Sequence, residues 1–206
     1  MPNLPILLAT SNPGKIRELG AILKPLNLTL LTLADLKDQY PPPAETGADF
    51  LANALLKARY YSDQSHLPAL ADDSGLEVKA LNGEPGVHSA RYGGEDLGDL
   101  KRSAYLLKKM ANIADRKARF RAVLALAYKG QSLTWSGELV GEIALEAKGE
   151  NGFGYDPIFI EPQSGLTLAQ MPLEAKNRIS HRARAGEALS LDLAKIAAFL
   201  GQFSQG

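Results

Sequence analysis

The chain has 206 residues, of which 45% are hydrophobic and 22% charged, as in folded globular domains and unlike disordered or fibrous chains. Its 23 basic and 23 acidic side chains cancel, which excludes the basic excess that contacts with a nucleic-acid polymer require. The absence of cysteine excludes disulfides, thiolate metal sites and thiol catalysis, and it suits a cytoplasmic location. No apolar run has the length of a transmembrane helix, so no membrane partner is expected.

The start of the chain predicts a strand, a helix and a second strand. An apolar run at 5–9 predicts the first strand, and apolar residues at helical spacing predict a helix over 15–23. The second strand is expected at 28–33, where leucine is mixed with threonine. Prolines at 41–43 then forbid regular structure.

Residues 10–15 place hydroxyl and amide side chains, a glycine and Lys15 where the first helix is expected to begin. Backbone N–H groups at a helix start attract anions, and Lys15 adds a positive charge, so this turn suits a phosphate group. It is not a P-loop, because Ala9 and Ile16 stand where that motif needs a glycine and a hydroxyl residue. An ordinary capped helix is the alternative.

Glu45 stands shortly before a second helix, which helical spacing predicts over 49–61. Asn53 and Lys57 share one stripe of that helix, and the stripe suits a cleft. Glu45 either complements the helix dipole or completes a magnesium site. Lys57 is either a solvated lysine or a phosphate contact.

Four polar residues, Asp72-Asp73-Ser74-Gly75, stand between strands expected at 67–71 and 76–81, and we expect them to form an acidic turn at a strand end. Two adjacent carboxylates can support Mg²⁺, which prefers oxygen ligands, and one of them can accept a proton from an attacking water. The alternative is a polar turn that uses these residues for its geometry alone.

The rest of the chain predicts a helix over 97–110, paired strands at 120–128 and 132–140, and a last helix over 185–200. Strands and helices interleave along the whole length, which favours an α/β fold. Because the paired strands are joined by a short turn, the sheet is expected to be mixed instead of purely parallel.

Two further segments suit the recognition of a base. Phe153 and Tyr155 lie on a glycine-rich backbone on which a flat base can stack, and Asp156 can hydrogen-bond to that base; the alternative is a turn whose rings fill the core. A basic cluster at 176–184 supplies donors for a keto oxygen or a phosphate, or else forms a solvated surface.

These segments together resemble the inosine triphosphate pyrophosphatase family, in particular its bacterial dITP/XTP pyrophosphatase branch, and the resemblance covers nearly the whole chain. The matching segments are Ala9-Thr10-Ser11-Asn12-Pro13-Gly14-Lys15, Glu45-Thr46-Gly47, Ala71-Asp72-Asp73-Ser74-Gly75-Leu76, Pro85-Gly86-Val87-His88-Ser89-Ala90-Arg91-Tyr92, Gly152-Phe153-Gly154-Tyr155-Asp156-Pro157 and Ile179-Ser180-His181-Arg182.

The resemblance implies an elongated mixed β-sheet flanked by helices, formed by one domain over residues 1–206 with two lobes and an active-site cleft between them, and usually a homodimer. It implies Mg²⁺ held by Asp73 and Glu45, with Asp73 as the proton acceptor assisted by Asp72. The residues it implies for substrate binding are Thr10, Ser11, Asn12, Pro13, Gly14, Lys15, Lys57, Ser74, Phe153, Gly154, Tyr155, Asp156, Lys176, His181 and Arg182.

The implied reaction is the attack of water on the α-phosphorus of a non-standard purine nucleoside triphosphate (ITP, dITP or XTP), which yields the monophosphate and pyrophosphate. Arg182 and its neighbours would favour the 6-keto group, so that adenine leaves buried donors unpaired. The rival readings are a Maf-type pyrophosphatase for pyrimidine or modified nucleotides and a non-catalytic module that binds nucleotides or RNA. The paired aspartates argue against that module, because a polyanion binder gains from carboxylates only through a bridging metal.

Overall fold

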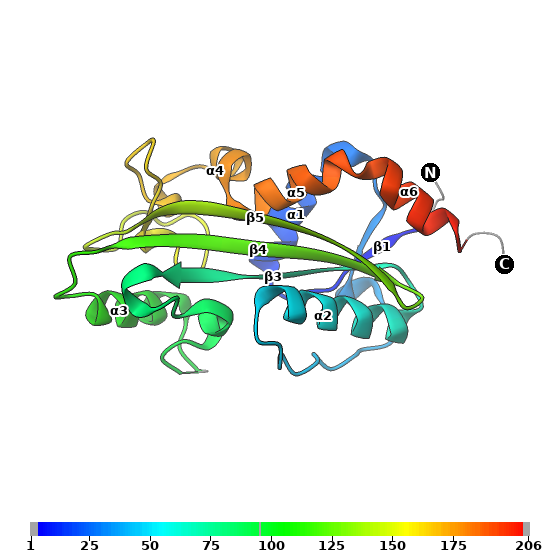
Figure 1. Ribbon diagram of the computed structural model, residues 1–206, viewed down its shortest axis with the longest axis horizontal. Coiled ribbons are helices and arrows are strands. Elements are labelled where there is room, and N and C mark those ends of the chain that lie inside the picture. The colour runs from blue at the N-terminus through cyan, green and yellow to red at the C-terminus, as the bar shows by residue number, and fades with distance from the viewer. Residues whose placement is uncertain (1–3, 95, 204–206) are drawn as a thin grey trace. The chain divides into compact units, whose positions relative to one another are not determined.

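A computed structural model describes residues 4–94 and 96–203, and in it the chain divides into two compact units (Figure 1). Unit 1 comprises the described residues up to Asp73, residues 122–137, and the described residues from Arg182 onward. Unit 2 comprises residues 74–121 and 138–181. Each unit has a hydrophobic core of its own.

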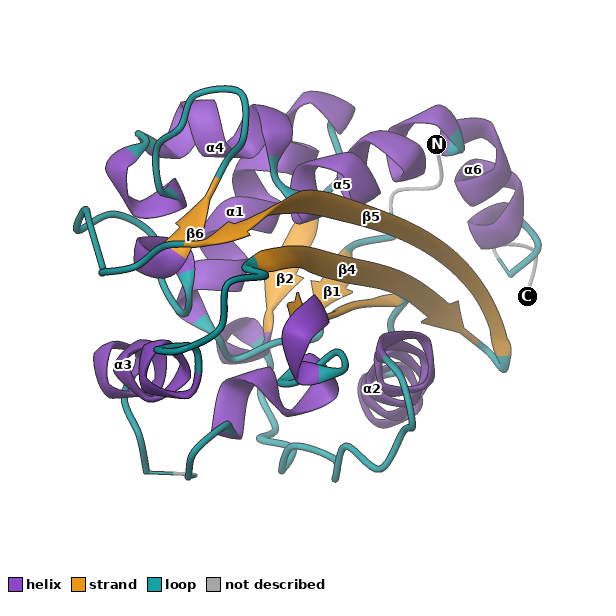
Figure 2. Cartoon of the chain, turned by 60° about the vertical axis from the view of Figure 1, so that its left-hand side comes forward, coloured by secondary structure: helices purple, strands orange, loops and turns teal. Residues whose placement is uncertain are grey.

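The strands form a mixed sheet in the order β2-β1-β3-β4-β5-β6, which confirms the expected α/β fold class (Figure 2). Strand β1 pairs in parallel with β2 and β3, whereas β5 pairs antiparallel with β6. Only Lys129 and Gly130 separate β4 from β5, and both residues have the positive φ angles that a two-residue hairpin needs. The strands are β1 (Ile6–Leu8), β2 (Leu30–Thr32), β3 (Ala69–Val78), β4 (Lys117–Tyr128), β5 (Gln131–Ile143) and β6 (Phe159–Ile160).

In unit 1 helices cover both faces of the strands, with α1, α5 and α6 on one face and α2 on the other (Figure 2). The helices are α1 (Pro13–Leu23), α2 (Phe50–Ser65), α5 (His181–Leu191) and α6 (Leu193–Gly201). Leu19, Leu124 and Phe199 pack in the same core, so the apolar stripes of α1 and α6 are buried against β4.

Unit 2 builds its core from α3 (Asp99–Lys109), α4 (Leu173–Ile179) and the parts of the strands that it contains. Leu106 of α3 packs with Leu76, Phe120 and Phe159. The sequence predicts α3, but α4 lies in the segment that was interpreted only as a basic cluster. In the described parts of the chain, no helix has the length and apolarity that a membrane crossing needs.

The expected acidic turn is wrong, because Asp72, Asp73, Ser74 and Gly75 lie inside the single strand β3. Asp, Ser and Gly are common in turns, but this strand has neighbours on both sides, β1 and β4, and they hold the backbone extended. Tertiary pairing therefore overrides the local preference.

The expected single helix over 185–200 is also wrong, since α5 ends at Leu191 and α6 begins at Leu193. Asp192 stands between them with φ −99° and ψ 15°, outside the helical region, and its Oδ2 accepts a hydrogen bond of 2.9 Å from Trp135 Nε1. The apolar spacing continues across the break, which is why it predicts one helix.

Two glycines give a paired test of packing. At Gly141 in β5 an added methyl group would overlap the carbonyl oxygen of Ile160 and lie 2.7 Å from the Phe159 ring, whereas at Gly20 in α1 it would meet nothing within 4 Å. We expect Gly141→Ala to lower the free energy of unfolding by about 1–3 kcal/mol through overpacking. Gly20→Ala should raise it by about 0.5–1 kcal/mol, because alanine favours the helix. Urea denaturation of both variants checks this; equal effects would contradict the close packing at Gly141.

Candidate active site

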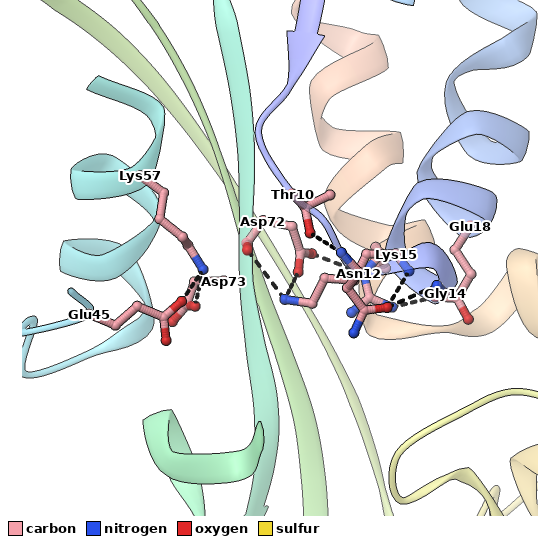
Figure 3. Close-up of polar contacts among 10 residues, drawn as sticks. Thr10, Asn12, Gly14, Lys15, Glu18, Glu45, Lys57, Asp72 and Asp73 are labelled. Atoms are coloured by element: carbon pink, nitrogen blue, oxygen red, sulfur yellow. Dashed lines mark hydrogen bonds and ion pairs between the residues drawn. The ribbon is translucent and has the colours of Figure 1, made fainter. Parts of the chain in front are cut away.

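The two aspartates of β3 point to opposite sides of the strand (Figure 3). Successive side chains of a strand alternate between its two faces, so the adjacent carboxylates cannot reach the same partner easily. Both are buried, with 1% of Asp72 and 5% of Asp73 exposed. Each carboxylate therefore needs its own cations, and the structure provides a separate set on each side.

On one side, Asp72 is paired with two cations from distant segments. Lys15 Nζ lies 2.6 Å from Asp72 Oδ1, and Arg182 Nε lies 2.9 Å from Asp72 Oδ2. Burial alone would raise the pKa of Asp72, but the charges of Arg182 and Lys15 hold it well below its usual range. Asp72 thus remains a carboxylate and is a poor proton acceptor.

Arg182 is buried in unit 1, where its Nη1 pairs with Glu18 of α1 in addition to its contact with Asp72. Burial lowers the pKa of Arg182, but the two carboxylates outweigh that effect and keep the guanidinium charged. Glu18 was not predicted as a site residue. Its position three residues after Lys15, on the same helix, is the signal that could have indicated it.

Lys15 is held at the start of α1 by a helix cap. Asn12 Oδ1 accepts hydrogen bonds from the backbone N–H groups of Gly14 at 2.9 Å and Lys15 at 3.1 Å, and Thr10 Oγ1 accepts one from the Asn12 N–H (Figure 3). The capped helix is therefore present, and it aims Lys15 at the sheet. Burial lowers the pKa of Lys15, and repulsion from Lys57 and Arg182 adds to this against the attraction of Asp72.

On the other side of β3, one lysine joins two carboxylates. Lys57 Nζ of α2 lies 2.5 Å from Asp73 Oδ1 and 2.8 Å from Glu45 Oε1 (Figure 3). Asn53, one turn earlier on α2, accepts a hydrogen bond of 2.7 Å from the Gly47 N–H and so fixes the segment that carries Glu45. The predicted polar stripe of this helix thus holds the acidic residues in place.

The pKa of Asp73 is shifted in the opposite direction to that of Asp72. Burial raises the pKa of Asp73 and outweighs the opposite effect of Lys57, and the nearby charge of Glu45 raises it further. A carboxylate with a raised pKa is a stronger base. Of the two aspartates, Asp73 is thus the better proton acceptor.

The geometry around Lys57 fits a divalent cation. Asp73 and Glu45 direct carboxylate oxygens at the same point, since both lie within hydrogen-bond distance of one nitrogen atom. Within residues 4–94 and 96–203 there is no group of three or more His, Asp or Glu side chains that could hold a metal ion. A cation bound here would take two protein ligands and complete its shell from substrate and water, which is the pattern of Mg²⁺.

Of the predicted base-binding residues, Phe153, Asp156 and Lys176 come together in unit 2, whereas Arg182 lies in unit 1. Asp156 Oδ2 accepts hydrogen bonds from the Phe153 N–H at 2.9 Å and from Lys176 Nζ, which lies 4.9 Å from the centre of the Phe153 ring. The His181 ring stacks on Phe120 with the ring centres 4.7 Å apart. Phe153 is only half-buried, whereas His181 is buried.

Tyr155 is buried in the core of unit 2, and its hydroxyl donates a hydrogen bond of 3.0 Å to the Ser89 carbonyl. The backbone between the two aromatic residues is held by α3. Asp99 Oδ2 accepts from the Gly154 N–H at 2.7 Å, and Ser103 Oγ donates to the Gly154 carbonyl at 3.1 Å. Asp99 and Ser103 were not predicted as site residues, because neither lies in a recognisable segment.

The predicted site residues thus fall into two groups. Thr10 to Lys15, Glu45, Lys57, Asp72, Asp73 and Arg182 lie in unit 1, whereas Ser74, the residues 153–156, Lys176 and His181 lie in unit 2. Arg182 neighbours His181 in the sequence, yet its described contacts are to carboxylates of unit 1. Unit 1 thus contains lysines and a carboxylate pair, and unit 2 contains a half-buried ring and a buried ion pair.

The chain belongs to the Ham1 family, whose model matches residues 6–191. It is 55% identical over 187 residues to a dITP/XTP pyrophosphatase of Thermus thermophilus, a match that covers 89% of each chain. It is 49% identical to a dITP/XTP pyrophosphatase of Geobacter sulfurreducens, over 87% of this chain and 92% of that one. A solved HAM1 protein from Coxiella burnetii has a TM-score of 0.84 and 42% identity, over 93% of this chain and 99% of that one. The resemblance inferred from the sequence is therefore confirmed.

The buried pairs of Asp72 lead to a stability prediction. We expect Asp72→Asn to lower the free energy of unfolding at neutral pH by about 3–5 kcal/mol, because Lys15 and Arg182 lose their shared carboxylate. Since the pKa of Asp72 is lowered by folding, its contribution is complete above the unfolded pKa of about 3.9 and is lost as the pH falls below that value. The variant should therefore lose less stability than the parent between neutral pH and pH of about 3.

Urea denaturation at both pH values makes the comparison, with Asp63→Asn as the control, because Asp63 is exposed on α2. The interpretation would be overturned by an Asp72→Asn protein as stable as the Asp63→Asn protein.

Proposed function

We propose that this member of the Ham1 family hydrolyses purine nucleoside triphosphates with a 6-keto base (ITP, dITP and XTP) to the monophosphate and pyrophosphate. The observation that carries the proposal is the convergence of Asp73 and Glu45 on one cationic position beside the lysine of a capped helix start. The dITP/XTP pyrophosphatases among its relatives support the substrate class.

The charge of the cluster favours a metal-bound substrate. Three cations, Lys15, Lys57 and Arg182, stand among four carboxylates, Glu18, Glu45, Asp72 and Asp73, so these seven side chains carry one net negative charge. A triphosphate is repelled by that charge unless a divalent cation accompanies it. Asp73 and Glu45 would hold Mg²⁺, which supplies positive charge to the phosphates and to the leaving pyrophosphate.

The helix start would bind the phosphate chain. Lys15 stands 16% exposed beside Asp72 and can extend a donor to a phosphate oxygen without leaving that carboxylate, because an ammonium group has three protons. Thr10 and Ser11 add hydroxyl groups next to it. The residues 12–14 shape the turn, and Lys57 gives a second positive charge on the other side of β3.

Asp73 would accept the proton of the attacking water. Water attacks the α-phosphorus, its proton passes to a carboxylate oxygen of Asp73, and the bond from the α-phosphorus to the bridging oxygen breaks as pyrophosphate leaves. Asp73 lies on the side of β3 where the metal ion is proposed to bind, so its carboxylate can take this proton, whereas Asp72 stays ionised and keeps Lys15 in position. The adjacent aspartates thus have different roles.

The base would stack on Phe153, with Lys176 and His181 as donors to the keto oxygen and Ser74 as a further substrate contact. Lys176 is 2% exposed and paired with Asp156, so its direction is fixed. Adenine has an amino group at the same position and cannot accept these hydrogen bonds, which leaves buried donors unsatisfied. Arg182 would also take part in selecting the 6-keto group.

A nucleotide panel tests the substrate class. With Mg²⁺, we expect pyrophosphate release from ITP, dITP and XTP at least about 100-fold faster, as kcat/KM, than from ATP, because of the unpaired donors. Pyrimidine triphosphates should be equally poor. A coupled assay for pyrophosphate, run beside an assay for orthophosphate, makes the measurement. Preference for pyrimidine or modified nucleotides would favour a Maf-type pyrophosphatase, and binding without turnover would favour a non-catalytic module.

The role of Asp73 is tested by Asp73→Asn, which keeps the shape of the side chain but removes the base and one metal ligand. We expect kcat for ITP to fall by about 10²–10⁴-fold, with an unchanged circular dichroism spectrum. Asp38→Asn, at an exposed position, should keep normal kcat. Near-normal turnover in the Asp73→Asn protein would move the proton acceptor elsewhere.

The homodimer and the cytoplasmic location that the resemblance implies are further parts of the proposal. Light scattering of the purified chain should give twice its mass of 22.1 kDa. A mass of one chain would contradict the dimer without affecting the proposed reaction.

A further inference from the structure

The ammonium group of Lys57 lies between the carboxylates of Asp73 and Glu45, at the position where a metal ion would bind. Its ammonium nitrogen lies 2.5 Å from Asp73 and 2.8 Å from Glu45, and its side chain is only 12% exposed (Figure 3). These are the two carboxylates that would hold the divalent cation. A lysine therefore balances them whenever a metal ion is not bound.

The ammonium group and a divalent cation cannot share this position. Two like charges about 4 Å apart repel each other strongly at the effective dielectric constant of a partly buried site. Metal binding must therefore displace the ammonium group from between the carboxylates.

We propose that Lys57 is an internal competitor of the metal ion, and that it makes metal binding depend on the nucleotide. Without nucleotide, the metal ion must displace the charged lysine from both of its carboxylate partners. With nucleotide, the phosphate oxygens give the displaced ammonium group new partners. The two ligands are thereby coupled through one side chain.

The coupling has a definite sign. If the nucleotide tightens metal binding, the metal ion must tighten nucleotide binding by the same factor, because linkage is reciprocal. The flexible four-carbon stem of Lys57 allows its head group to move while α2 stays in place. This mechanism favours occupation of the site by metal and nucleotide together, which deepens the proposed function and rests on it.

The test measures metal binding without catalysis. Mn²⁺, a paramagnetic substitute for Mg²⁺, is titrated into the wild-type chain and into Lys57→Met, and free Mn²⁺ is followed by electron paramagnetic resonance. Methionine keeps an unbranched side chain that is one atom shorter, and it removes the charge. Without nucleotide, we expect Lys57→Met to bind Mn²⁺ about tenfold more tightly than wild type, within the usual range of such couplings.

The same titration is repeated with ITP whose α,β-bridging oxygen is replaced by a methylene group. This analogue should tighten Mn²⁺ binding by the wild-type chain by about tenfold more than it tightens binding by Lys57→Met. Lys57→Gln is a second variant in case the methionine protein does not fold. Equal Mn²⁺ affinities of the wild-type chain and the folded variant without nucleotide would overturn the proposal.

Two controls localise the effect. Arg59→Met removes the same charge from an exposed position two residues later on α2, and it should leave the Mn²⁺ affinity unchanged. Adding Glu45→Gln to Lys57→Met should abolish the gain, because one of the two carboxylates is lost. A gain in the Arg59→Met protein would show a general charge effect and contradict the proposal. If Mn²⁺ binding changes as expected but pyrophosphate is not released, only the proposed function is contradicted. If pyrophosphate is released but Mn²⁺ binding does not change as expected, only the competition by Lys57 is contradicted.

Discussion

The burial of two consecutive carboxylates in the middle of β3 is the constraint on which the site of unit 1 depends. Asp72 and Asp73 have 1% and 5% of their surface exposed, and isolated buried charges of this kind are strongly unfavourable. Because a strand sends them to opposite sides, one group of cations cannot serve both. The chain must bring a lysine to each side, Lys15 from α1 and Lys57 from α2, and this requirement fixes both helices against the sheet.

The two buried carboxylates are balanced by different sets of cations. The difference suits Asp72 to a supporting role and Asp73 to the proposed chemistry. Asp72 has two cations, both deeply placed, and its pKa is lowered, so it is a fixed negative charge. Asp73 has Lys57, which it shares with the half-buried Glu45, and its pKa is raised. One more cation is needed to balance the second pair of carboxylates. The side chains of this site lack one positive charge, so the site is suited to an anion that carries a metal ion.

The sequence could predict those features of the site that depend on residues close together along the chain, but not those that depend on distant residues. The polar stripe of Asn53 and Lys57 follows from local spacing and was predicted, and the capped helix start was the alternative reading of residues 10–15. The placement of Asp72 and Asp73 inside a strand could not be predicted, because Asp, Ser and Gly favour turns and only the neighbours β1 and β4 keep this segment extended. Glu18 and Asp99 were missed for a similar reason: their partners, Arg182 and Gly154, are far away in the sequence.

Arg182 and His181 are adjacent in the sequence, yet their contacts in the structure differ. Arg182 follows His181 directly, and the sequence groups the two as donors to a base. In the structure, the described contacts of Arg182 lead through Asp72 to Lys15, while His181 stacks on Phe120 in unit 2. The peptide bond between them is also the boundary between the two units. A change at Arg182 therefore acts on the carboxylate that positions the phosphate-binding lysine, whatever further part this arginine has in reading the base.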